Sequence, residues 1–189
     1  MLNPDIHHRR SIRLKGYDYS QTGAYFVTIC THKRERLFGD INSGEMRINE
    51  YGVIAAESWI WLPQQYGYID LDEWIVMPNH MHGILVIADC CRGGSRTAPT
   101  GTQTRKTLGR LIGAFKTVSS KQINLLRNSP GVILWQRNYY EQIIRNEAEL
   151  NKMREYIRSN PLNWESDENF ANRTQDLNAL SLPGRVREY

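Results

Sequence analysis

The sequence predicts an α+β fold in a single domain. Short segments rich in β-branched and aromatic residues alternate along the chain with longer segments of helical periodicity. Only Pro78-Asn79 separates two of the apolar segments, which predicts a tight antiparallel hairpin because both residues are turn formers. With 189 residues and 40% hydrophobic content, the chain is long enough for one core and too short for two comfortable domains. We therefore expect a sheet that contains an antiparallel hairpin and is covered by helices.

One strand and one helix are predicted before the hairpin. Residues 25–30 combine aromatic and β-branched side chains, which is typical of a strand. A helix is predicted for residues 50–62, and Pro63 is expected to end it. The positions at helical spacing that we expect to face the core are Val53, Ala56 and Ile60. The tryptophans of this helix are expected in the core or at its rim, rather than as platforms for bases.

Two histidines, His80 and His82, open the second strand of the hairpin, which follows the strand at residues 73–77. Alternation places both on one face with Ile84 and Val86, and apolar residues on both faces predict a central strand. Same-face residues lie about 6.6 to 7 Å apart, so converging imidazoles can hold one metal ion. An unpaired polar group on a buried strand costs about 1 to 3 kcal/mol. The histidine pair therefore needs partners.

A second helix and a further strand are predicted after the hairpin. Thr107 can cap the helix, whose outer side is basic through Arg110, Lys116 and Lys121. Its predicted buried stripe consists of Leu108, Leu111, Ile112, Phe115, Val118 and Ile123. Residues 132–135, Val-Ile-Leu-Trp, are predicted to form the strand.

The last predicted helix carries a tyrosine and ends near an asparagine. Asn146 and Glu149 form a capping-box pattern at its start. At about 100° per residue, Tyr156 and Asn160 flank the buried stripe together. Pro161 disfavours helical geometry for the residue before it, so the helix should end at Asn160 and leave that amide free to reach inward.

The tyrosine and the histidine pair together suggest phosphoryl chemistry. Taken alone, Tyr156 fits an ordinary packing role. A tyrosine hydroxyl is, however, a competent nucleophile toward phosphorus when a divalent ion polarises the phosphate, and no serine, cysteine or lysine nucleophile motif competes with it. Two imidazoles and one neutral oxygen ligand leave coordination positions open, which suits Mg²⁺ or Mn²⁺ better than a closed zinc site.

The charge distribution suggests that the protein binds nucleic acid, and the cysteine content suggests that it is cytoplasmic. The net charge is +4, but residues 1–16 carry +3 and residues 90–106 carry +4, so the remainder carries −3. Such placement suits a polyanion, although ordinary solvated charge remains the alternative. The three cysteines, of which two are adjacent, form no disulfide framework and match no usual zinc spacing. With neither an apolar run of 18 residues nor a signal-peptide pattern, we expect a soluble, cytoplasmic protein.

The predicted organisation is a basic arm (1–16), a catalytic domain (17–164) and a C-terminal tail (165–189). Within the domain, residues 90–106 are predicted to be a mobile basic loop, either a neutral insertion or a strap that orders over nucleic acid. The tail carries five acidic residues and three arginines, and a role in competing with DNA is a hypothesis. The candidate DNA contacts are Arg9, Arg10, Arg13, Lys15, Arg34, Arg110 and Lys116.

Several of these segments resemble one known family. The pattern Val-Met-Pro-Asn-His-Met-His at 76–82, followed by Tyr-Ile-Arg-Ser-Asn-Pro at 156–161, is similar to the single-tyrosine HUH transposases of the insertion-sequence-200-like type. Among these it most closely resembles the REP-associated tyrosine transposases. The resemblance covers roughly residues 9–164. Its further matching segments are 9–14, 17–20, 23–28 and 135–140.

The resemblance implies a fold, a site and a reaction. It implies an RRM-like or ferredoxin-like antiparallel sheet with helices packed on it, with His80, His82 and Asn160 as ligands of Mg²⁺ or Mn²⁺. Tyr156 would cut single-stranded, hairpin-forming DNA, leaving a 5′-phosphotyrosine and a free 3′-hydroxyl, and a second attack would rejoin strands without ATP. Residues 9–13 would read bases beside the hairpin foot. The protein would associate with the bacterial nucleoid.

Other readings stay open on the sequence. The family includes swapped dimers and monomers; its REP-associated branch leans towards monomers, and no residue here decides between them. A water-using, metal-dependent nuclease would need the same metal ligands. A non-catalytic DNA-binding module of the same fold is the other alternative, although intact Tyr156 and histidines argue against it.

Overall fold

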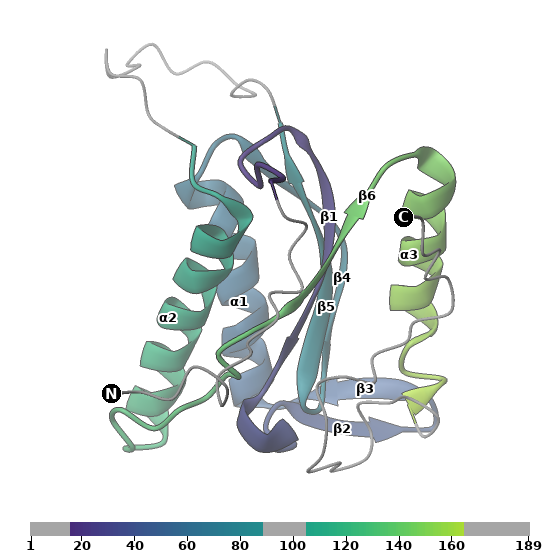
Figure 1. The fold of residues 1–189 in the computed structure, drawn as a ribbon. Helices are drawn as coiled ribbons and strands as arrows, with labels where there is room; N and C mark the ends of the chain where they lie inside the picture. The colour runs from purple at the N-terminus through teal and green to yellow at the C-terminus, as the bar shows by residue number, and fades with distance from the viewer. Residues whose placement is uncertain (1–15, 89–104, 165–189) are drawn as a thin grey trace, which may run out of the picture.

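The computed structural model describes residues 16–88 and 105–164, and it shows an antiparallel sheet between helices. Helices α1 and α2 cover one face of the sheet and α3 covers the other (Figure 1). The predicted α+β fold is therefore confirmed. In chain order the elements are β1 (Gly23–Cys30), the 3₁₀ turn η2 (His32–Arg34), β2 (Gly39–Asn42), β3 (Glu45–Ile48), α1 (Glu50–Gln65), β4 (Ile69–Met77), β5 (His80–Ile87), α2 (Leu108–Leu126), β6 (Tyr140–Ile144) and α3 (Glu147–Ser159).

The sheet has the strand order β4-β5-β1-β6, with every neighbouring pair antiparallel. The predicted hairpin is present, since Met77 pairs with His80 across the turn. Strand β5 is interior, as its two apolar faces predicted. On the α1–α2 side it contributes Met81 and Leu85 to the larger core, whereas Ile84 faces α3 in a smaller cluster. The register of β5 thus points both histidines toward α3.

Helix α1 is rotated relative to the prediction. Ala55, Trp59 and Leu62 are buried, whereas Val53 and Ile60 are 40% and 43% exposed. The indole of Trp59 lies over Gly83 of β5, where an added Cβ would come within 2.7 Å of the ring. Burial of this large side chain outweighs that of two aliphatic ones, so it sets the rotation.

Pro63 does not end α1, contrary to the prediction. The helix runs on to Gln65, and the Tyr66 N–H donates to the Leu62 carbonyl at 2.9 Å. The proline removes only its own N–H donor, and helical bonding resumes beyond it.

We expect Gly83→Ala to destabilise the protein by about 1 to 3 kcal/mol, because the methyl group would overpack the Trp59 ring. Urea unfolding followed by fluorescence would measure this loss. The control is Gly113→Ala in α2, where nothing lies within 4 Å of an added Cβ and the change should be neutral or stabilising. Equal stability of both variants would contradict the packing argument.

The last strand of the sheet, β6, does not lie at the predicted residues 132–135. Residues 132–135 form no strand; Trp135 makes one isolated bridge to Thr31, and Ile133 is 63% exposed. Strand β6 instead pairs with β1 from Tyr140 to Ile144. Apolar content alone favoured the wrong segment, because the position of the free edge of β1 depends on the folded sheet.

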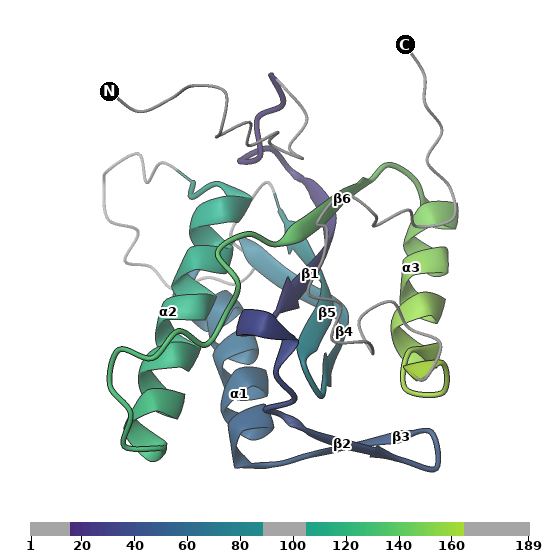
Figure 2. The same ribbon diagram turned by 60° about the horizontal axis from the view of Figure 1, so that its bottom comes forward.

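Hairpin β2–β3, which the sequence did not predict, lies across one end of the sheet and reaches beneath α3 (Figure 2). Predictions for the arm and the tail lie outside the described residues, apart from Gly16. Of the basic loop, Arg105 and Lys106 are described, and the Lys106 Nζ donates to the Tyr66 hydroxyl at 2.9 Å. Thr107 precedes α2 without a capping hydrogen bond from its side chain. No helix in the described part of the chain has the length and apolarity to span a membrane.

Candidate active site

His80 and His82 face each other on the α3 side of the sheet. Both are buried, and their Nε2 atoms lie 2.9 Å apart. Two nitrogens each about 2.1 Å from one ion, at right angles, would lie about 3.0 Å apart. The spacing therefore fits two neighbouring ligands of a single metal ion.

The other ring nitrogens are held by hydrogen bonds. His80 Nδ1 lies 2.8 Å from Asn79 Oδ1, and His82 Nδ1 lies 2.8 Å from Thr28 Oγ1. Because an amide oxygen only accepts, His80 carries its proton on Nδ1 and leaves the Nε2 lone pair for a metal. The Thr28 hydroxyl can accept in the same way from His82.

Burial, and secondarily the positive charge of Arg34, lowers the pKa of His80 to about 3. The imidazole is therefore neutral near pH 7. Since only a neutral imidazole offers a lone pair to a metal, this ligand needs no deprotonation there.

Asn160 supplies an oxygen beyond the end of α3. It is 3% exposed, and its Oδ1 is buried without a hydrogen-bond partner in the described structure. Its backbone is helical (φ −57°, ψ −42°), contrary to the geometry predicted from Pro161, yet α3 ends at Ser159 as the proline suggested. A buried oxygen without a partner is costly and suits a ligand to an ion.

The candidate metal ligands are therefore the two imidazoles, which lie side by side, and the buried Asn160 Oδ1. Within residues 16–88 and 105–164, no group of three or more His, Cys, Asp or Glu side chains could hold a metal. The residues fit Mg²⁺ or Mn²⁺ with coordination positions left for substrate oxygens.

Tyr156 packs against His82 of this pair. Its ring centroid lies 5.1 Å from that of His82 and 5.8 Å from that of Phe26, edge-on in both cases. Ile157 and Met153 anchor the helix in the smaller cluster beside it. His82 and Tyr156 are 74 residues apart in the sequence, yet their rings are in contact on one face of the sheet.

Trp164, which follows α3 in the chain, contacts His80 of the histidine pair. Trp164 stacks on His80 with centroids 5.9 Å apart, and the Arg36 guanidinium lies 5.7 Å from the Trp164 ring centroid. A pocket of about 350 Å³ lies beside this stack, between the β2–β3 hairpin and the turn after α3. Thr28, Asn79 and Trp164 were not predicted to be site residues. Asn79, adjacent to His80, was predicted only as a turn residue.

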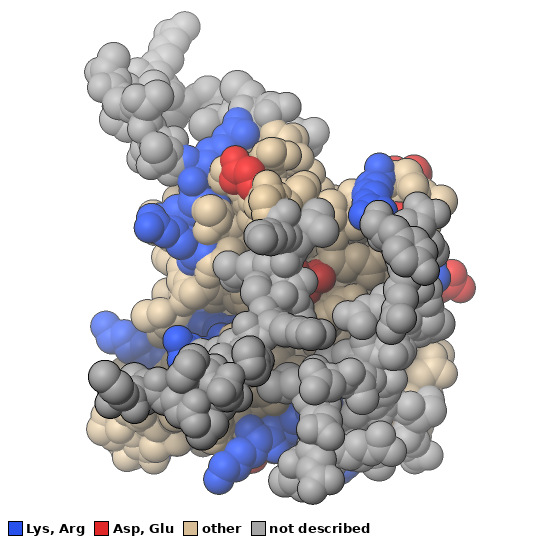
Figure 3. Space-filling view, in the orientation of Figure 1, with Lys and Arg blue, Asp and Glu red and all other residues tan. Residues whose placement is uncertain are grey.

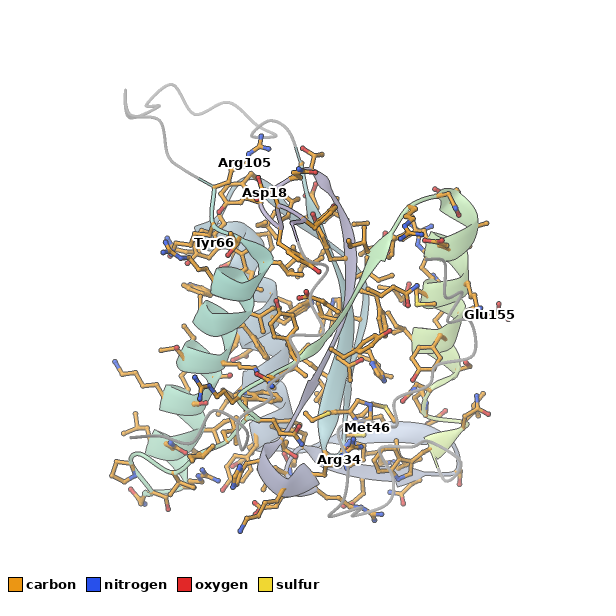
Figure 4. The ribbon with its side chains drawn as sticks, viewed as in Figure 1. Asp18, Arg34, Met46, Tyr66, Arg105 and Glu155 are labelled. Carbon is orange, nitrogen blue, oxygen red and sulfur yellow. The ribbon has the colours of Figure 1, made fainter. Side chains whose placement is uncertain are left out.

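The predicted DNA-contact residues are dispersed. Arg34 lies near His80, whereas Arg110 and Lys116 lie on α2, across the sheet from Tyr156. Figure 3 shows the basic side chains of the described residues spread over the α2 side and both ends of this face, and Figure 4 places Arg34 and Met46 at the β2–β3 end. The arm residues Arg9, Arg10, Arg13 and Lys15 lie outside the described part.

Lys116 has a structural role that the sequence did not reveal. Its Nζ donates to the carbonyls of Gln136 and Asn138 at 2.8 and 3.0 Å. Burial lowers the pKa of Lys116 to about 8. This amine holds the segment before β6 in place, so the structure does not support it as a phosphate contact.

We expect Thr28→Val to weaken Mn²⁺ binding about 10- to 100-fold, because the isosteric change removes only the hydroxyl that orients His82. Titration calorimetry would measure the affinity. Thr117→Val, which removes a similar hydroxyl from α2, serves as the control. Unchanged affinity in the Thr28 variant would exclude this orienting role.

Comparison with known proteins places the chain in a family. No family model matches it. An uncharacterized protein of Haemophilus influenzae is 38% identical over 173 residues, covering 88% of this chain and 95% of that protein. The chain belongs to the same family as this Haemophilus protein. A solved structure of a REP-associated tyrosine transposase bound to a REP hairpin is 18% identical, with a TM-score of 0.51, and covers 81% of this chain and 73% of that chain. The chain has the REP-associated tyrosine transposase fold, as the motif resemblance implied.

Proposed function

We propose that this chain is a metal-dependent transposase that cuts and rejoins hairpin-forming single-stranded DNA through a 5′-phosphotyrosine. The observation that carries this proposal is the packing of Tyr156 against His82, one of two buried histidines whose Nε2 atoms lie 2.9 Å apart. A nucleophile and metal ligands thereby share one site on a transposase fold.

His80, His82 and Asn160 would hold Mg²⁺ or Mn²⁺. When bound, the ion would polarise the scissile phosphate and offset its negative charge. The Tyr156 hydroxyl attacks phosphorus, the bond from phosphorus to the 3′-oxygen breaks, and the proton lost by tyrosine is balanced by the one that the leaving 3′-oxygen gains. Attack by a 3′-hydroxyl on the phosphotyrosine reverses these changes and rejoins a strand. One ester bond replaces another in each step, so ATP is not needed.

The surroundings of Tyr156 support this role. Phe26 and His82 contact its ring edge-on, which restricts the directions in which the hydroxyl can point. Restricting a nucleophile in this way lowers the entropic part of the barrier.

The proposed partner is hairpin DNA. The solved structural neighbour was bound to a REP hairpin, and the basic arm and loop of this chain would add phosphate contacts. We place the protein in the bacterial cytoplasm, at the nucleoid when bound to DNA, acting as a monomer or as a swapped dimer.

One experiment tests the proposal. Protein, end-labelled hairpin DNA and Mg²⁺ are incubated and then separated on a denaturing gel. A labelled species at the mass of protein plus DNA, absent with EDTA, supports the tyrosine reaction. Cutting without this adduct would identify a water-using nuclease, and binding without cutting would identify a non-catalytic module; either result overturns the proposal.

A further inference from the structure

Two ion pairs join α3 to the edge strand β4. Arg154 donates from Nε and Nη2 to the two carboxylate oxygens of Asp72, at 2.8 and 2.7 Å. Arg158 donates to Glu73 at 2.7 Å. The side chains of Arg154 and Asp72 are only 28% and 22% exposed. The hydrogen bonds from Arg154 lower the pKa of Asp72, so its carboxylate is charged near neutral pH.

The two acids are adjacent in sequence, and a bulge lets both reach α3. The register of β4 against β5 shifts between Leu71 and Trp74, so that Asp72 and Glu73 together oppose Ile84. In a regular strand, successive side chains point to opposite faces, whereas a bulge can turn two successive residues to one side. The Glu73 N–H also donates to Asp72 Oδ1 at 2.8 Å, which fixes the carboxylate.

The ion pairs and the tyrosine lie on opposite flanks of α3. Arg154 and Arg158 are about 40° apart around the helix, and Tyr156 is about 160° from each. Between the flanks lies the buried stripe of Met153 and Ile157. One flank is thus attached to β4, while the other carries Tyr156 to His82 of β5.

Apolar packing on this side of the sheet is limited. Helix α3 is the one described helix on this face, and its fully or nearly buried residues are Met153 and Ile157 (Figure 1). Figure 4 shows Glu155 pointing away from the sheet. The partly buried Leu150 and Tyr156 add to this packing. Such apolar contacts resist separation of α3 from the sheet but only weakly resist rolling about the helix axis, because hydrophobic burial is non-directional. A bidentate arginine–carboxylate pair is directional and resists that rolling.

Rolling would displace the reactive atom. The tyrosine hydroxyl lies about 9 Å from the helix axis, given a Cα radius of about 2.3 Å and an extended side chain. A roll of about 10° would move it by about 1.5 Å, and a displacement of about 1 Å can cost roughly 10²-fold in rate.

We propose that Asp72 and Glu73, the bulge acids of β4, are positioning residues that set the rotation of α3 and thereby place the Tyr156 hydroxyl at the His80–His82 pair. The consequence for rate rests on the proposed transposase function. The rotation of α3 does not, so the two can be tested separately.

The test uses full-length protein with 3-fluorotyrosine at position 156 and the double variant Asp72→Asn/Glu73→Gln. The ¹⁹F chemical shift reports the position of the ring between His82 and Phe26, without any reaction. Single-turnover adduct formation at saturating hairpin DNA, the DNA dissociation constant and the melting temperature are measured alongside. Since 3-fluorotyrosine is more acidic than tyrosine, rates are compared between unlabelled proteins.

We expect the double variant to change the ¹⁹F shift and to slow adduct formation by roughly 10- to 100-fold, while the DNA dissociation constant stays within twofold. Two matched controls each remove one acidic charge from α3. Glu147→Gln takes away the exposed partner of Arg154 within the helix, and Glu155→Gln changes the outer side. Neither should alter the shift or the rate.

An unchanged ¹⁹F shift in a folded double variant would overturn the proposal, whatever the rate. If the double variant does not fold, Arg154→Lys replaces it, because lysine keeps the charge but loses the bidentate geometry. The same shift change is then expected, and its absence is decisive. If wild type forms no adduct, the proposed function fails, while the shift still decides whether the acids position Tyr156.

Discussion

Replacing Tyr156 by phenylalanine is expected to abolish the covalent DNA adduct, a loss of about 10³-fold or more. Phenylalanine retains the ring that packs against His82 and Phe26 and removes only the hydroxyl. DNA binding and thermal stability should therefore stay close to wild type. A denaturing gel with end-labelled hairpin DNA measures the adduct, and a mobility-shift titration measures binding.

Tyr140 provides a matched control for this substitution. It lies on β6, pairs with Thr28 of β1 and packs against the same apolar cluster as Phe26. Since Thr28 in turn pairs with His82, Tyr140 occupies the same cross-strand row as His82, two strands away. Tyr140→Phe should preserve the adduct. Loss of the adduct in that variant, with its persistence in Tyr156→Phe, would assign the nucleophile to Tyr140 instead.

Replacing Asn160 by leucine is expected to have opposite effects on stability and on metal binding. The Oδ1 of Asn160 is buried without a partner in the described structure, so its removal should be neutral or stabilising by up to about 1 to 3 kcal/mol in EDTA. The same change removes the proposed oxygen ligand. Affinity for Mn²⁺ should fall by at least the 10- to 100-fold that loss of an outer-shell partner produces. Melting temperatures with EDTA and with a series of Mn²⁺ concentrations measure both effects.

Asn124→Leu separates this prediction from a general effect of removing a buried amide. Asn124 is buried too, but its amide donates to the Val132 carbonyl at 2.8 Å and accepts from Arg127 at 2.9 Å. Its loss should lower stability equally with and without metal. If Asn160→Leu behaved like Asn124→Leu, with metal-dependent stabilisation intact, Asn160 would be a structural residue and not a ligand.

The sequence by itself determined the local features of the site. Alternation within β5 places His80 and His82 on one face, and the two-residue turn at Pro78-Asn79 sets their register against β4. Helical periodicity and the Asn146 cap place Tyr156 and Asn160 together at one edge of α3. These inferences were possible because strand and helix periods act over a few residues, where the chain's own geometry decides.

The tertiary structure alone decided which distant segments meet. Thr28 orients His82 although 54 positions separate them, and β1 accepts residues 140–144 at its free edge in place of the more apolar 132–135. The rotation of α1 follows from the space above Gly83, and that of α3 from a bulge 82 positions before Arg154. Each of these features depends on packing volume or on a contact between residues far apart in the sequence, and local periodicity carries no information about either. The sequence therefore determined the candidate site residues and the faces on which they lie, and the fold decided which distant residues hold and orient them.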